Sequence, residues 1–110
     1  GQRGRFQEAG ETLLKAIELI PEDVMARVYL GLVAIDAGEL EFAAEAFRGA
    51  LALEPAHAKA NYYMALVYGR QQRYAEALAH VEQTLRTQPD FPDAAQMKEG
   101  LIQALRGAGK

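Results

Sequence analysis

A spacing of 34 residues runs through the chain and limits the folds available to it. Three of the four prolines, Pro21, Pro55 and Pro89, stand at this spacing. A period in this range is typical of a solenoid, in which one supersecondary unit is copied and stacked. Large and small apolar positions repeat at the same step, as four sets show: Phe6/Leu40/Tyr74, Ala9/Ala43/Ala77, Leu13/Phe47/Val81 and Ile17/Leu51/Leu85.

Each copy of the unit is predicted to hold two helices closed by a proline. Apolar residues at helical spacing predict helices over about residues 5–20, 24–37, 39–53, 56–71, 73–87 and 93–106. A proline disfavours the α conformation at the residue before it, so each proline ends a helix. Gly38 suits a left-handed helix stop. Because the connections are short, neighbouring helices are expected to run antiparallel.

The composition excludes several classes of protein. With 50% apolar and 25% charged residues among 110, the chain is expected to form a folded domain. The net charge is −3 and residues of both signs are interspersed. The chain therefore lacks the basic stripe that binding to nucleic acid or to an anionic membrane requires. No apolar run approaches the roughly 20 residues needed to cross a bilayer. Cysteine is absent, which rules out disulfides, a thiol nucleophile and thiolate metal sites.

With these residues at these spacings, the sequence resembles the tetratricopeptide repeat, whose signature is W-x2-L-G-x2-Y, A-x3-F and P. Two departures stand out: Arg27 and Asn61 replace the tryptophan, and Ala34 replaces the first tyrosine. The corresponding positions are Leu30-Gly31, Ala43, Phe47 and Pro55 in one unit; in the next, Met64-Ala65 replaces the L-G pair, and Tyr68, Ala77, Val81 and Pro89 follow.

The predicted fold class is therefore all-α, a right-handed solenoid of antiparallel helix hairpins forming a single domain over residues 1–110. It comprises the second helix of a partial repeat (5–21), two full repeats (24–57 and 58–91) and a helix at 93–106 that resembles the solvating helix closing such arrays. Gly31 is expected to face Ala43, and Phe47 to fill the space between one hairpin and the next. The partial repeat is expected to expose Phe6 and Leu14.

The sequence contains no recognisable catalytic pattern. We expect that the chain is not an enzyme and that it binds no cofactor or metal. His57 and His80 lack the i, i+4 pairing of a helical metal site, and each is interpreted as a capping or surface histidine. Glu39, Glu41 and Glu45 are interpreted as a solvated helix start, where negative charge is favourable.

A binding surface is better supported, because stacked hairpins form an extended concave face. The resemblance implies that the first helix of each repeat lines this face, with contacts from residues at five positions of the helix. A two-carboxylate clamp is disfavoured, since only Lys59 matches and Tyr29 and Tyr63 stand where Asn and Arg are required. An apolar groove for a peptide or partner helix fits better. The predicted peptide-binding residues are Met25, Val28, Leu32, Ile35, Asp36, Lys59, Tyr62, Leu66 and Arg70.

Several alternatives stay open. The apolar residues could pack against upstream helices, or a second copy could dock on the incomplete first repeat to form a homodimer. The chain could also be a scaffold segment of a larger multi-repeat protein. Its residue usage suggests a bacterial source, and the compartment stays open between cytoplasm and periplasm.

Overall fold

A computed structural model describes residues 2–108 of the chain, and the described part contains α-helices and no strand. Residues 1, 109 and 110, which the predicted single domain includes, lie outside that part, and the domain assignment stays a prediction. The bounds of the described helices agree with the predicted bounds within a few residues. None of these helices is both long and apolar enough to span a bilayer. They are α1 (Gln2–Leu19), α2 (Val24–Asp36), α3 (Leu40–Leu53), α4 (Ala58–Arg70), α5 (Tyr74–Thr87) and α6 (Ala94–Ala108).

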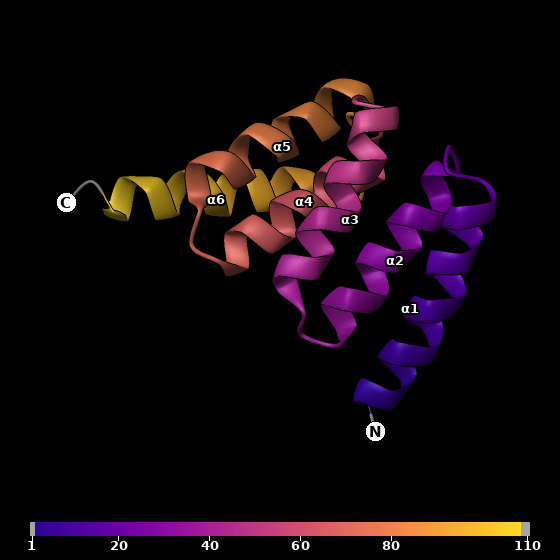
Figure 1. The fold of residues 1–110 in the computed structure, drawn as a ribbon. Coiled ribbons are helices and arrows are strands. Elements are labelled where there is room, and N and C mark those ends of the chain that lie inside the picture. The colour runs from indigo at the N-terminus through magenta and orange to yellow at the C-terminus, as the bar shows by residue number, and fades with distance from the viewer. Residues whose placement is uncertain (1, 109–110) are drawn as a thin grey trace. The chain divides into compact units, whose positions relative to one another are not determined.

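The helices group into two compact units, one ending at Pro55 and the other starting at Ala56. In the first unit α2 packs against both α1 and α3, and Figure 1 shows it between them. In the second unit α5 packs against both α4 and α6. The predicted hairpins are therefore present as α2–α3 and α4–α5.

The turn inside each hairpin has the same backbone geometry. Gly38 follows α2 with a φ of 78°, and Gln72, one period later, follows α4 with a φ of 62°. The next residue closes each turn: the Glu39 amide donates to the Ala34 carbonyl at 2.8 Å, and the Arg73 amide donates to that of Tyr68 at 2.8 Å. This wide closing bond with a left-handed residue before it is the Schellman arrangement. The predicted stop at Gly38 is confirmed.

The entry to each hairpin is capped by a side chain at equivalent positions. The carboxylate of Asp23 accepts from the Ala26 amide at 3.1 Å, and Nδ1 of His57 accepts from the Ala60 amide at 3.1 Å. These bonds satisfy amides that the first turn of a helix leaves without a partner. The interpretation of His57 as a capping residue is confirmed.

The contact inside the first hairpin differs from the prediction in its details. A Cβ atom added to Gly31 would lie 2.5 Å from both Cε1 and Cζ of the Phe47 ring. The Phe47 ring therefore lies directly against Gly31 within its own hairpin, while the expected pairing of Gly31 with Ala43 and the expected packing of Phe47 toward the next hairpin stay predictions. The ring has no exposed surface. One period later Ala65 and Val81, both buried, replace this pair, so a larger residue on one helix is matched with a smaller one on the other.

The C-terminal helix has the two faces expected of a solvating helix. Leu101 is buried against the rest of its unit, whereas Glu99, Gln103 and Arg106 are exposed. An ion pair of 3.6 Å between Lys98 and Glu82 links α6 to α5.

At the other end, α1 is only partly as predicted. Leu14 is 48% exposed, as expected for a partial repeat. Phe6 is not fully exposed, because its ring packs edge-on against Phe42 of α3 with centroids 5.6 Å apart.

Candidate binding surface

One row of side chains along α2 combines apolar character with exposure. Its members are spaced four, three and four residues apart, so they share one face of the helix. Met25 is 37% exposed and Tyr29 is 49% exposed, although both are large and apolar in part. Leu32 is half-buried and Asp36 is exposed at the C-terminal end. We call these four residues, Met25, Tyr29, Leu32 and Asp36, the α2 stripe.

Two predicted binding residues of α2 lie outside this stripe. Val28 has no exposed surface and Ile35 is 9% exposed, so both belong to the packed core of α2. The prediction that they line an accessible groove is wrong for the structure as it stands. The places carried over from the family assign these residues to α2, and the packing of α2 against α1 and α3 decides which of its residues stay accessible.

Tyr29 is the residue that sequence reasoning missed. The sequence marks it only as a mismatch to a carboxylate clamp, yet it is more exposed than Met25 and Leu32, the other two apolar members of the α2 stripe. The available signal was its spacing: Tyr29 lies four residues after Met25 and three before Leu32.

The equivalent row on α4 is more polar. Lys59, Tyr63 and Leu66 are half-buried and Arg70 is exposed. These four residues, which we call the α4 stripe, lie one period after the members of the α2 stripe. Three of them were predicted binding residues, and Tyr63 takes the place that Tyr29 has in α2. Each stripe is a feature of its own unit.

The remaining predicted residue, Tyr62, is half-buried in an aromatic cluster. Its ring lies 4.9 Å from that of Phe91 and 5.2 Å from that of Tyr63, measured between centroids. Burial raises the pKa of the Tyr62 hydroxyl above its usual value of 10.0, and the negative charge of Asp93 and the neighbouring Tyr63 raise it further. Tyr62 thus links the start of α4 to the segment leading into α6.

The two histidines take structural positions. Nδ1 of His80 lies 2.9 Å from Oδ1 of Asn61, whose amide nitrogen donates to the His57 carbonyl at 3.2 Å. The Thr84 hydroxyl donates to the Ala58 carbonyl at 2.9 Å. The His80–Asn61 and Thr84–Ala58 bonds join α4 to α5 across a buried interface, where unpaired polar groups would be costly. Asn61, which replaces the signature tryptophan, is therefore a partner for His80.

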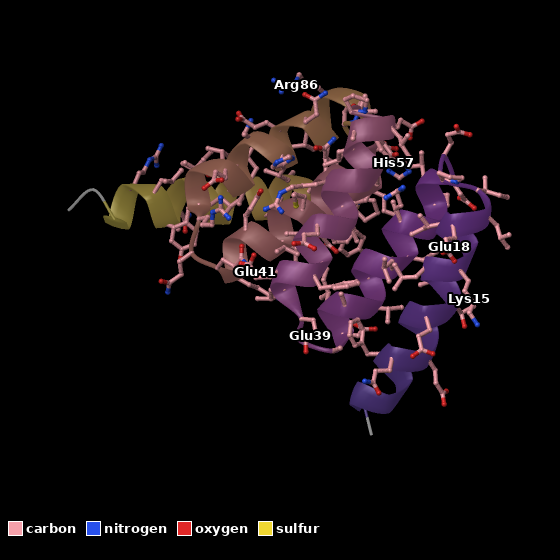
Figure 2. The ribbon with its side chains drawn as sticks, in the orientation of Figure 1. Lys15, Glu18, Glu39, Glu41, His57 and Arg86 are labelled. Carbon is pink, nitrogen blue, oxygen red and sulfur yellow. The ribbon has the colours of Figure 1, made fainter. Side chains whose placement is uncertain are left out.

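The acidic residues near the start of α3 are solvated. Figure 2 shows Glu39 at the turn before α3 and Glu41 on that helix. Glu41 and Glu45 are exposed and Glu39 is half-buried. Within residues 2–108 no group of three or more histidine, cysteine or acidic residues is arranged to hold a metal ion.

Comparison with known proteins identifies the architecture. Two family models, both described as tetratricopeptide repeat, match residues 1–58 and 34–101. No sequence among the curated proteins matches the chain.

Three solved structures illustrate the similarity of the fold. The first tetratricopeptide domain of Spaghetti (RPAP3), bound to the HSP90 peptide SRMEEVD, has a TM-score of 0.89 and 20% identity over 94% of this chain and 82% of that chain. The first such domain of human RPAP3 has a TM-score of 0.88 and 20% identity over 96% and 83%. The Yersinia enterocolitica type III secretion chaperone SycD, in complex with a peptide of the translocator YopD, has a TM-score of 0.83 and 15% identity over 93% and 83%.

At these identities the structures establish the fold alone, an all-α solenoid of helix hairpins. Each family model covers more than half of the chain, and together they span both full repeats. The chain belongs to the tetratricopeptide repeat family.

Proposed function

We propose that this chain is a non-catalytic protein-interaction module that binds a peptide or a partner helix. The observation that carries the proposal is the α2 stripe, where Met25 and Tyr29 are exposed although they would be favourable to bury. Exposed apolar side chains bordered by charge are characteristic of interaction sites. Two of the structural neighbours hold peptides, which supports the same kind of role for this chain.

The α2 stripe favours a ligand anchored by apolar side chains. Tyrosine and methionine supply large contact area, and Leu32 extends it along α2. The α4 stripe is considered by itself: its Lys59 and Arg70 supply positive charge that would attract acidic groups of a partner of that unit. We propose that Val28 and Ile35 support α2 from within and make no contact with the ligand.

A ligand bound mainly through its terminal carboxylates fits the chain less well. Spaghetti is bound to the HSP90 peptide SRMEEVD. In this chain only Lys59 matches the clamp of such receptors, while Tyr29 and Tyr63 stand at positions where the clamp requires Asn and Arg. Neither tyrosine supplies the charge-assisted donor that a carboxylate prefers.

Selection from a displayed peptide library, followed by variants of the α2 stripe, tests the proposal. Leu32→Glu and Tyr29→Ala should each weaken binding of the selected peptide by about tenfold or more, since about 1.4 kcal/mol of contact energy corresponds to tenfold. Leu53→Glu is the control, because it makes the same substitution at an exposed leucine that lies outside the α2 stripe, at the end of α3. Circular dichroism verifies that all three variants keep their helices. Unchanged binding by both stripe variants would remove the α2 stripe from the site.

Self-association is a second candidate, favoured by apolar residues exposed around the end of α1. Leu19 and Ile20 are largely exposed, and Leu14 lies on the same helix as Leu19. A second copy would bury them. Light scattering at high protein concentration tests this directly, and a strictly monomeric species would exclude it.

A further inference from the structure

The two compact units differ in charge and in the apolar surface that they expose. Residues 1–55 contain ten acidic and five basic residues, a net charge of −5, whereas residues 56–110 contain five acidic and seven basic residues, a net charge of +2. Among the residues that the structure describes, the large apolar side chains that are exposed all lie in the first unit. A ligand of the α2 stripe therefore meets apolar groups on the acidic half of the chain.

The C-terminal end of the α2 stripe carries negative charge. Asp36 is exposed, and the last turn of α2 contains no basic residue. The carbonyl groups at the end of a helix add a partial negative charge at the same place. Glu39, in the turn between α2 and α3, contributes a further carboxylate (Figure 2). This end of the stripe therefore favours a positively charged group on the ligand.

The α4 stripe has the opposite charge at equivalent positions. Asp36 stands one period before Arg70, and Met25 stands one period before Lys59. The last turn of α4 thus holds a basic residue, whereas that of α2 holds an acidic one. The two central residues, tyrosine and leucine, are the same in both stripes. The charge at the ends of the stripe, rather than its centre, distinguishes α2 from α4.

The spacing of the α2 stripe matches that of a second helix better than that of an extended peptide. Its members are four, three and four residues apart, which is the alternation found along the seam of paired helices. At a rise of about 1.5 Å per residue, the four residues lie at about 0, 6, 10.5 and 16.5 Å along α2. An extended peptide places the side chains of one face about 6.8 Å apart, so its third and fourth side chains would be out of step by about 3 and 4 Å. A partner helix with the same spacing keeps a side chain level with every member of the stripe.

We propose that the α2 stripe binds one basic amphipathic α-helix of a partner protein. The apolar row of this helix repeats the spacing of four and three residues and packs on Met25, Tyr29 and Leu32, and its lysine or arginine meets Asp36. This inference rests on the proposed function and names the class of ligand for the same site. Charge complementarity selects the partner, because opposite charges attract across an interface and like charges disfavour the wrong ligand.

Three synthetic peptides of equal length are the probes. The first is a helix of alanine and glutamine with three leucines spaced four and three residues apart and a lysine four residues beyond the last leucine. The second carries glutamate in place of the lysine. The third is the first peptide with two central alanines replaced by proline, which prevents a helix. Fluorescence anisotropy during titration with the whole chain should show saturable binding of the lysine peptide. The other two peptides should each bind about fivefold more weakly or worse.

Asp36→Arg, which copies Arg70 of α4, tests the charge at the end of the stripe. It should weaken binding of the lysine peptide by about fivefold or more and strengthen binding of the glutamate peptide. Glu45→Arg is the matched control, because it makes the same charge change at an exposed acidic residue of α3, outside the stripe. It should change either dissociation constant by less than about twofold. Asp36 and Glu45 are both exposed, so both variants should keep their helix content, which circular dichroism verifies.

Leu32→Glu separates failure of this inference from failure of the proposed function. If it abolishes binding of the library-selected peptide while the lysine and glutamate peptides bind equally, the α2 stripe is a binding site but selects no basic ligand, and this inference alone is overturned. Equal binding of the proline peptide and the lysine peptide would overturn the helical partner, and no binding of any of the three would overturn the inference as a whole. A dimer that Leu32→Glu dissociates, seen by sedimentation without peptide binding, would make a second copy the occupant and equally overturn it.

Discussion

Replacing Gly31 by alanine would test most sharply how the hairpins of this protein are packed. In a helix interior this substitution ordinarily stabilises, because alanine is favoured over glycine by about 1 kcal/mol. Here the added methyl group would meet the Phe47 ring at 2.5 Å from Cε1, 2.5 Å from Cζ and 2.8 Å from Cε2. The ring has no exposed surface, so relieving this contact requires it to move among other buried side chains.

The two effects oppose each other, and their sizes decide the sign. Adding atoms to a well-packed interior costs about 1–3 kcal/mol. Three ring atoms closer than 3.0 Å place Gly31→Ala at the upper end of that range. After the gain in helix propensity of about 1 kcal/mol, the variant should lose about 1–2 kcal/mol of unfolding free energy.

A compensating change follows from the second hairpin, where Ala65 and Val81 occupy the two places. Phe47→Val alone should cost about 2–4 kcal/mol, because it leaves a cavity against Gly31. The double variant Gly31→Ala/Phe47→Val should cost less than the sum of the single variants, with a coupling free energy of about 1–3 kcal/mol. Gly10→Ala is the matched control, since its new methyl group meets only Leu30 at an ordinary 3.9 Å.

Urea unfolding followed by far-UV circular dichroism measures all four variants. Gly10→Ala should be neutral or more stable by up to about 1 kcal/mol, whereas Gly31→Ala is less stable. Strict additivity of the Gly31 and Phe47 substitutions would refute the reasoning. So would a Gly31→Ala protein as stable as Gly10→Ala, because the ring would then have moved at no cost.

Three further predictions concern the turn, the cap and the aromatic cluster, and urea unfolding measures each of them. Gln72→Gly should raise the unfolding free energy by about 1 kcal/mol, because the φ of 62° at Gln72 is unfavourable for a residue with a Cβ atom. Gly38→Ala should lower the unfolding free energy by a similar amount. A lower unfolding free energy for Gln72→Gly would contradict this view of the turn. His57→Ala should cost about 1 kcal/mol by removing the acceptor for the Ala60 amide, while His57→Asp, which copies Asp23, should restore the stability. Equal losses in both variants would show that His57 stabilises the protein by something other than the cap. The pKa of Tyr62 in the folded chain is raised above 10.0, so the unfolded chain loses this proton first as the pH rises. The contribution of Tyr62 to the unfolding free energy is therefore fully present below pH 10.0 and is lost as the pH rises through the folded pKa. The unfolding free energy of Tyr62→Phe should decline less over that range, and identical pH profiles of the two proteins would contradict the assignment.

Much of the fold could be predicted from the sequence, because the strongest signals are local. Prolines follow the ends of α1, α3 and α5 by two residues, and they cannot continue a helix. Gly38 marks its turn for the same kind of reason. Gln72 gives no such signal, and its left-handed conformation follows only from its place one period after Gly38.

The candidate site was less predictable, because exposure depends on which neighbours a helix has. Val28 and Met25 are both apolar and both lie on α2, yet Val28 is fully buried and Met25 is not. Asn61 likewise could be identified as a departure from the signature, but its bond to His80 depends on the packing of α4 against α5. Spacing assigns residues to a helix face, and only the packed structure shows which faces remain accessible.

The proposal that α2 binds a partner is tested most directly by methyl-selective NMR of the chain during titration with a library-selected peptide. The account predicts saturable shifts of the Met25 and Leu32 methyl groups, both on the α2 stripe, while the Leu53 methyl groups at the end of α3 stay unchanged. Shifts confined to Leu53 and other residues away from the α2 stripe, with Met25 and Leu32 unaffected, would contradict it.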